Sequence, residues 1–299
     1  MDENSALPVL AKARAEFEKL VSEIRPELHR YCARMTGSVV DGEDVVQDTL
    51  AKAFYLLPQT ASIANIRSWI FRIAHNKAVD YTRSHARRFG ESLDEHPDIA
   101  ADAEPMGTQE MAKMGLALFI KLTPAQRGAV ILKDVLGHSL SEIAEILDAS
   151  VSSIKGALNR GRASLRRLGR DAGESAPPLD RSEASLLEGY VKHFAARDFD
   201  KLRELLAQDV RLDLVGMSQG RGASEVGGYF HRYGGVEDWR VQVGSVEGRP
   251  AILVFNAQEP SEAPVYFMLI DWVNGEVARI RDYRYARYVM ADAEVSVQA

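Results

Sequence analysis

The 299-residue sequence predicts a multidomain fold: two all-α domains, the second containing a helix-turn-helix, followed by an α+β domain. Apolar residues recur at helical spacing through residues 17–57 and again through residues 65–90. Residues 139–168 read as two amphipathic helices separated by a three-residue turn. After residue 183, two helical segments precede five short runs rich in alternating apolar residues, which is typical of an α+β domain.

The charge distribution favours local rather than overall attraction to a polyanion. The chain carries a formal net charge of −6, so it is not a basic protein. Residues 65–90 nevertheless hold six Lys or Arg against one acid, whereas residues 91–110 hold seven acids and no Lys or Arg. Because the local field steers a charged partner, a nucleic acid would meet particular segments rather than the whole surface.

Several classes of site and location are not predicted. The single cysteine, Cys32, excludes an internal disulfide and a cysteine-based zinc site. His193 and His231 lack a third ligand at metal spacing, so we expect neither a metal nor a cofactor. The sequence shows no apolar run long enough to cross a membrane and no signal peptide, so we expect a cytoplasmic protein without membrane contact.

The first predicted domain, residues 1–90, contains three helical segments. Pro26 interrupts the first segment and is expected to begin a new helix at its first turn. Asp41 is expected to cap the next helix, with Glu43 and Asp44 on the exposed face. The inward face of that helix is expected to comprise Val45, Val46, Thr49, Leu50, Ala53 and Phe54.

The third helical segment combines aromatic residues with cations. It follows a loop, residues 58–64, and begins at Asn65 or Arg67. Aromatic rings among cations suit melted DNA, because bases stack on rings while cations follow the phosphates. For Trp69, core packing and contact with DNA both remain open. The exposed face is expected to comprise Arg67, Arg72, Asn76, Lys77, Asp80, Arg83, Arg87 and Arg88.

The helix-turn-helix carries clear signals at its helix ends. Ser139 and Glu142 form a capping box, residues 148–150 form the turn, and Ser150 caps the second helix. In such motifs the N-terminal residues of the second helix meet base edges, while flanking cations meet phosphates. A basic surface helix within a bundle is the alternative. The expected base contacts are Ser152, Ser153, Lys155 and Asn159, and the expected phosphate contacts are Arg160, Arg162, Arg166 and Arg167.

Three segments in this order resemble bacterial sigma-70-type factors of the extracytoplasmic-function (ECF) group. They are DGEDVVQDTLAKAF, WIFRIAHNKAVDYTRSHARR, and LTPAQRGAVILKDVLGHSLSEIAEIL with SVSSIKGALNRGRASL. The resemblance implies a sigma factor that directs core RNA polymerase to specific promoters and has no active site of its own for RNA synthesis. It implies sigma domain 2 over residues 1–90, an acidic linker over 91–112 that threads the RNA-exit channel, and sigma domain 4 over 113–170.

The resemblance also implies roles for individual residues. The loop at residues 58–65 matches the one that captures a flipped base of the −10 element. The helix after residue 150 matches the reader of the −35 element, through Ser152, Ser153, Lys155, Asn159, Arg160 and Arg162. The core-polymerase contacts implied are Asp44, Val45, Gln47 and Asp48. The −10 contacts implied are Asn65, Arg67, Trp69, Arg72, Asn76, Asp80 and Arg83.

A linker at residues 171–182 leads into residues 183–292, which resemble the SnoaL-like, nuclear-transport-factor-like cone. The segments that carry this resemblance are LLEGYVKHFAARDFDKLRELLAQDVRLDLVG, GRPAILVF and LIDWVNGEVARIRDYRYARY. The resemblance implies a fused domain that regulates the sigma factor in cis. It also places Tyr190, Asp213 and Asp271 near the two oxyanion donors and the base of ketosteroid isomerases.

Three readings of the C-terminal domain stay open: an isomerase, a small-ligand pocket without turnover, and a protein-contact module in which these three residues only pack. We also hypothesise that this domain contacts the sigma domains and holds them against each other, using the Tyr- and Arg-rich strip IRDYRYARYV. For the whole chain, the alternative is a stand-alone helix-turn-helix regulator. That alternative leaves residues 41–54 and 69–88 without a role.

Overall fold

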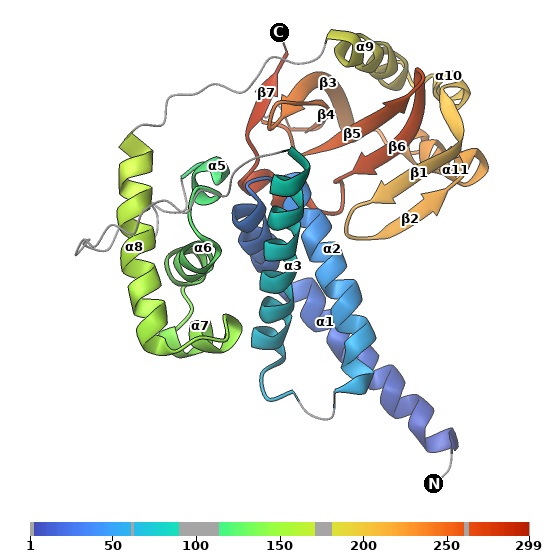
Figure 1. The fold of residues 1–299 in the computed structure, drawn as a ribbon. Coiled ribbons are helices and arrows are strands. Elements are labelled where there is room, and N and C mark those ends of the chain that lie inside the picture. Colours follow the sequence, from blue (N-terminus) through green and yellow to red (C-terminus); the bar gives the residue numbers. More distant parts are fainter. Residues whose placement is uncertain (1–2, 61–62, 90–113, 171–180, 260–262, 299) are drawn as a thin grey trace. The chain divides into compact units, whose positions relative to one another are not determined.

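The structure, a computed structural model, describes residues 3–60, 63–89, 114–170, 181–259 and 263–298, with the side chains of residues 3–15, 89, 170, 181 and 182 left undescribed. The chain divides into two compact units, residues 1–173 and 174–299, and each is treated by itself. The first unit is helical and the second is built on one sheet (Figure 1). Two all-α segments followed by an α+β domain is the fold class that the sequence predicts.

The first bundle of unit one contains three long helices: α1 (Glu3–Thr36), α2 (Val39–Leu56) and α3 (Ile66–Phe89), with a short 3₁₀ turn η1 (Leu57–Gln59) after α2. The prediction that Pro26 begins a new helix is wrong, because α1 runs through it without a break. Ile24 and Leu28 are fully buried on either side of Pro26, so packing on the core holds the helix together there.

The N-cap of α2 lies three residues before the predicted one. Ser38, rather than Asp41, caps α2, and its Oγ accepts from the Asp41 N–H at 3.2 Å. Gly37 takes a φ of +82°, which favours glycine. A Cβ on Gly42 would lie 2.6 Å from the Ala33 Cα and N atoms, so a side chain there would force α1 and α2 apart.

Two side chains of α2 face the opposite way from the prediction. Glu43, expected on the surface, is 1% exposed and forms an ion pair with Arg25 of α1. Phe54, expected inward, is 46% exposed. A buried carboxylate needs a paired cation, and Arg25 supplies it from eighteen residues away, which local sequence patterns do not reveal.

The second bundle of unit one contains the helix-turn-helix. Its elements are α5 (Leu116–Phe119), α6 (Pro124–Val130), a π-helical turn η2 (Ile131–Val135), α7 (Leu140–Ile146) and α8 (Val151–Arg170). The capping box of Ser139 and Glu142 is present, and the Ser150 Oγ accepts from the Ser153 N–H at 3.1 Å. Asp148 turns the chain with a φ of +51°. The predicted capping box, the turn and the cap of the second helix are therefore all confirmed.

Unit two contains a seven-stranded sheet in the order β2-β1-β6-β5-β4-β3-β7, in which only the β1–β6 pairing is parallel. Its helices are α9 (Arg181–Ala195), α10 (Phe199–Glu204) and α11 (Ala223–Gly234), with a 3₁₀ turn η3 (Arg287–Ala291). Its strands are β1 (Leu206–Leu214), β2 (Ser218–Arg221), β3 (Trp239–Val246), β4 (Arg249–Asn256), β5 (Tyr266–Val273), β6 (Glu276–Asp282) and β7 (Val295–Val297).

Three of these elements, β2, α11 and β7, were not expected from the sequence. Helix α11 holds Gly227 and Gly228, which weaken its helical signal, yet Val226, Phe230 and Tyr233 are buried and hold it on the sheet. Within the described part of the chain, no helix is both long and apolar enough to cross a membrane.

Candidate nucleic-acid interface

The first turns of α8 present a polar face to solvent. Ser152, Ser153, Lys155 and Asn159 are all exposed, as expected. Ile154 and Leu158 are 2% and 3% exposed and fix the opposite face of α8 in the core. The buried face therefore sets the direction of the four polar side chains, which is the arrangement that a groove-reading helix needs.

Arg162, predicted to contact phosphate, lies instead in an internal ion pair. Its Nε and Nη2 atoms donate to the two carboxylate oxygens of Asp134 at 2.8 and 2.5 Å. Hydrogen bonding to Asp134 raises the pKa of Arg162. The Arg162 side chain is 14% exposed, so it joins α8 to η2 rather than facing solvent. Arg160 and Arg166 are half-buried, and Arg167 is exposed.

On α3, four of the predicted −10 residues form one exposed row. Arg72, Asn76, Asp80 and Arg83 follow each other at intervals of four, four and three residues, and each is exposed. Such spacing places them on one helix face. Trp69 is partly buried and packs against the core, so its ring edge is only partly accessible.

Two further −10 candidates have structural partners. The Asn65 Oδ1 accepts from the Ser68 N–H at 3.1 Å and caps α3. Arg67, 45% exposed, forms an ion pair with Glu27 of α1. Residues 61 and 62 of the predicted base-capturing loop lie outside the described residues.

The expected core-polymerase surface on α2 is only partly available. Asp48 is 70% exposed and pairs with Lys77 at 3.2 Å, while Asp44 and Gln47 are half-buried. Val45 is 4% exposed and belongs to the core. Tyr55 is 70% exposed, next to the exposed Phe54. Exposed aromatic side chains are informative because they are favoured at protein interfaces, and sequence reasoning missed them here.

A buried arginine links the two bundles of unit one. The Arg127 guanidinium donates to the Met35 carbonyl oxygen of α1 at 2.5 Å. It also donates to the carbonyl oxygens of Ile120 and Leu122 at 2.7 and 2.9 Å. Burial lowers the pKa of Arg127 to about 10, so it stays charged at neutral pH. One cation thus satisfies carbonyl groups in both bundles.

Two histidines extend this contact. The Tyr31 hydroxyl and the His75 Nδ1 are 2.8 Å apart, and burial, together with nearby Arg127, lowers the pKa of His75 to about 4. His138 Nε2 lies 3.1 Å from the Glu27 carboxylate, and the His138 ring meets Phe71 edge-on at 5.3 Å. We call Tyr31, His75, Glu27, His138 and Arg127 the inter-bundle seam.

In unit two, the residues matched to an isomerase site do not converge. Tyr190 is 1% exposed, burial raises the pKa of its hydroxyl, and that hydroxyl has no hydrogen-bond partner among the described residues. Asp213 forms an ion pair with Arg279, and Asp271 pairs with Arg281 at 3.3 Å. Asp213 lies between the inward-facing Leu212 and Leu214, so alternation turns it to the other face of the sheet.

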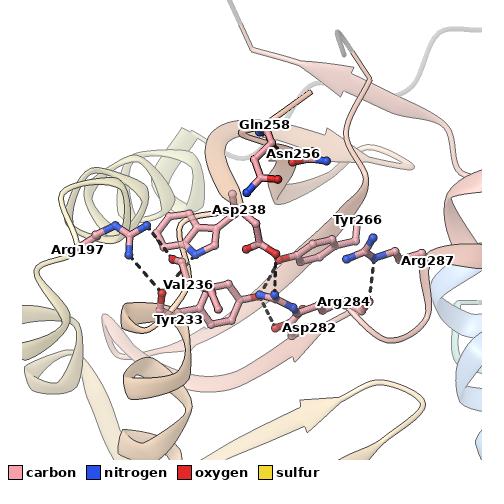
Figure 2. A network of polar contacts seen from close by, with 11 residues as sticks. Arg197, Tyr233, Val236, Asp238, Asn256, Gln258, Tyr266, Asp282, Arg284 and Arg287 are labelled. Atoms are coloured by element: carbon pink, nitrogen blue, oxygen red, sulfur yellow. Dashed lines mark hydrogen bonds and ion pairs between the residues drawn. The ribbon is translucent and has the colours of Figure 1, made fainter. Parts of the chain in front are cut away.

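The acid that does face the helices of unit two is Asp282, which was not singled out from the sequence. It is fully buried and accepts from the Tyr229 and Tyr233 hydroxyls at 3.1 and 2.8 Å. The Tyr266 hydroxyl lies 3.0 Å from that of Tyr233, and Figure 2 shows Tyr233, Tyr266 and Asp282 of this network. Burial raises the pKa of Asp282. Across the described residues, no group of three or more His, Cys, Asp or Glu could hold a metal ion.

Comparisons with known proteins place two family matches on unit one. The family model for sigma-70 region 2 matches residues 20–88, and the model for sigma-70 region 4 matches residues 116–165. The RNA polymerase sigma factor CnrH of Cupriavidus metallidurans is 32% identical over 139 residues, covering 43% of this chain and 73% of CnrH.

The ECF RNA polymerase sigma factor SigG of Mycobacterium tuberculosis is 30% identical over 234 residues. The match covers 69% of this chain and 63% of SigG, so the chain spans under two thirds of that relative. The crystal structure of the Mycobacterium tuberculosis factor SigJ is 20% identical, covers 90% of this chain and 95% of SigJ, and has a TM-score of 0.33.

The inter-bundle seam predicts a pH dependence of unit one. His75 has a pKa of about 4 when folded and about 6.5 when unfolded, so the unfolded state binds more protons between these values. Stability is therefore complete above about pH 6.5 and falls as the pH drops toward 4, by up to about 3 kcal/mol.

Urea unfolding of the full chain at about pH 7 and about pH 5 measures this difference. His75→Asn keeps an acceptor for Tyr31 and should flatten the pH dependence. The exposed His85 of the same helix provides the control substitution His85→Asn, which should retain it. An unchanged pH dependence in His75→Asn would show that His75 is not responsible.

Proposed function

The chain belongs to the sigma-70 family of RNA polymerase sigma factors, in the ECF group, and on this premise we propose that it directs bacterial core RNA polymerase to specific promoters. The observation that carries the proposal is a pair of exposed polar rows, Arg72 to Arg83 on α3 and Ser152 to Asn159 on α8. A stand-alone helix-turn-helix regulator would use the second row and leave the first without a role.

The proposal assigns one function to each of the exposed surfaces of α8, α3 and α2. Helix α8 reads the −35 element in the major groove, and the α3 row holds the melted −10 strand, where cations and amides meet phosphates and bases. The exposed part of α2, with Asp48, Phe54 and Tyr55, meets core polymerase in the cytoplasm. Val45 and Arg162 are assigned structural tasks instead, because each is buried within the unit.

The domain limits in this proposal are residues 1–90 for sigma domain 2, 113–170 for sigma domain 4 and 183–292 for the cone. The linker at 91–112 is assigned to the RNA-exit channel, although it lies outside the described residues. The family matches at residues 20–88 and 116–165 lie within the first two of these ranges and support them.

In this proposal, unit one with its two bundles packed together is an inactive resting state. Elements at −35 and −10 lie about 25 base pairs apart, roughly 85 Å of duplex at ~3.4 Å per base pair. The longest helix of this unit, the 34-residue α1, is only about 51 Å long at ~1.5 Å per residue. Because the seam joins the two bundles directly, α3 and α8 cannot occupy both elements until the seam opens.

Substitutions of Lys155 and Arg162 distinguish a loss of promoter contact from a loss of folding stability. Lys155→Ala removes an exposed cation, so run-off transcription with core polymerase should fall about tenfold at limiting DNA while the urea midpoint stays unchanged. Arg162→Ala leaves the Asp134 carboxylate buried and unpaired, which should cost about 3 kcal/mol of stability. The exposed Lys121 provides the control Lys121→Ala, which should change neither quantity. Full activity of Lys155→Ala on a selected promoter would contradict the proposed role of α8.

Glu27 tests whether the seam restrains polymerase binding. Glu27→Ala removes the contact to His138 across the bundles, so the open form should gain about fivefold in population and core polymerase should bind correspondingly tighter. Binding is measured without promoter DNA, because the substitution also releases Arg67. Glu23, exposed on the same helix, gives the control Glu23→Ala. Equal binding by both variants would remove the case for a resting state.

The C-terminal domain is assigned a regulatory role in cis, as an inhibitor of unit one. The support is that unit one contains both exposed polar rows by itself, so the proposed promoter contacts need no residue of unit two. Run-off transcription with residues 1–173 should therefore exceed that with residues 1–299. Activity confined to the full chain would instead make the domain a required positive contact.

A further inference from the structure

Unit two contains a cavity of about 160 Å³ where β3 begins, β4 ends and β5 begins. Its polar lining comes from Asp238, Asn256, Tyr266, Arg284 and Arg287, and Trp239 supplies part of its apolar wall (Figure 2). We call this space the Arg284 cavity. It is separate from Tyr190, Asp213 and Asp271, none of which lines it.

Positive charge predominates in the Arg284 cavity. The Arg284 guanidinium lies 5.2 and 6.0 Å from the ring centroids of Tyr233 and Tyr266, and the Arg287 guanidinium lies 5.6 Å from that of Tyr266. The one carboxylate in the lining is Asp238, which meets Arg284 at 3.3 Å. Two cations against one anion leave a site that favours an anionic ligand.

The two arginines are held to different degrees. The Arg284 guanidinium is half-buried and meets Asp238 at 3.3 Å, while the Arg284 main-chain N–H donates to the Asp282 carboxylate at 2.9 Å. The exposed Arg287 is anchored by one hydrogen bond, from its Nε to the Arg284 carbonyl oxygen at 3.3 Å. Guanidinium groups suit a carboxylate, because both are planar and pair through two parallel hydrogen bonds.

The apolar lining and the size define the rest of the ligand. Trp239 and Phe255 are 7% and 2% exposed, and Val265 completes an apolar side of the cavity. A cavity of roughly 150 Å³ is large enough for benzene. The Arg284 cavity therefore has room for a single aromatic ring.

One polar atom remains without a partner at this site. The Asp238 Oδ1 is buried and accepts no hydrogen bond from the described residues, while Oδ2 faces Arg284. A buried, unsatisfied carboxylate oxygen is costly, so a ligand that donates a hydrogen bond there gains affinity. The ligand that completes the site carries a hydroxyl as well as an acid group.

We propose that the Arg284 cavity binds a small aromatic carboxylate bearing a hydroxyl group, with the carboxylate toward Arg287 and the hydroxyl toward Asp238. The inference concerns the C-terminal domain alone and does not depend on promoter recognition. It gives the domain a ligand-binding capacity without requiring any reaction.

Isothermal titration of the full chain with three probes tests the proposal. 4-Hydroxybenzoate should bind tightest, whereas benzoate should bind about tenfold more weakly because it leaves the Asp238 Oδ1 unsatisfied. 4-Hydroxybenzamide, which has the hydroxyl but no charge, should also bind about tenfold more weakly.

Substitutions in the lining of the Arg284 cavity test which residue contacts which group of the ligand. Arg287→Gln should weaken 4-hydroxybenzoate binding about tenfold and leave the amide unaffected, and Arg287→Lys should fall between. Asp238→Asn should reduce the preference for a hydroxyl, because a neutral oxygen is a weaker acceptor. Arg211, exposed on β1 and outside the cavity lining, gives the control Arg211→Gln, and thermal unfolding verifies that each variant folds.

Three outcomes would overturn the proposal. The first is that no probe produces heat with the folded wild-type chain up to its solubility limit. The second is that Arg287→Gln binds 4-hydroxybenzoate as well as the wild type does. The third is that Arg211→Gln weakens binding as much as Arg287→Gln, which would mean unspecific attraction of anions to the surface.

Discussion

The interaction on which unit one depends is the bonding of one buried guanidinium to three main-chain carbonyl oxygens. Arg127 reaches Met35 at the end of α1 and Ile120 and Leu122 ahead of α6. Since each carbonyl lies where a helix ends or a turn begins, water would otherwise have to satisfy it. Burial, together with the same cation, lowers the pKa of His75 and so sets which protonation state the packed unit accepts.

The helix-turn-helix could be predicted from the sequence because its signals are local. Ser139, Glu142 and Ser150 act within three residues of the helix ends that they cap. Pairs such as Asp134 and Arg162, 28 residues apart, have no such signature, so an arginine that looks like a phosphate contact can serve the core. The exposed row on α3 was predictable, whereas the capping role of Asn65 and the pairing of Arg67 were not.

In the C-terminal domain, the strands were predictable from alternation but the buried acid that faces the helices was not. The sequence offers several aspartates at strand positions, and a shift of one residue exchanges the two faces of a sheet. Asp213 and Asp271 pair with arginines of β6, while Asp282, at the end of β6, faces the tyrosines. Tyr229 and Tyr233, which donate to Asp282, both lie on α11. This helix was not expected from the sequence, because Gly227 and Gly228 weaken its helical signal.

In the proposed resting state, the inter-bundle seam combines apolar packing with polar bonds. Buried apolar side chains of both bundles form one continuous cluster, which favours the packed state. The specific bonds across the seam, those of Arg127 and that between Glu27 and His138, are polar, and in our proposal water or polymerase groups replace them at a net cost of about 1 kcal/mol each. If only apolar side chains met at the seam, water or polymerase groups could not replace their contacts in this way. In this proposal, polar bonds at the seam therefore define one packed arrangement and still allow the two bundles to separate.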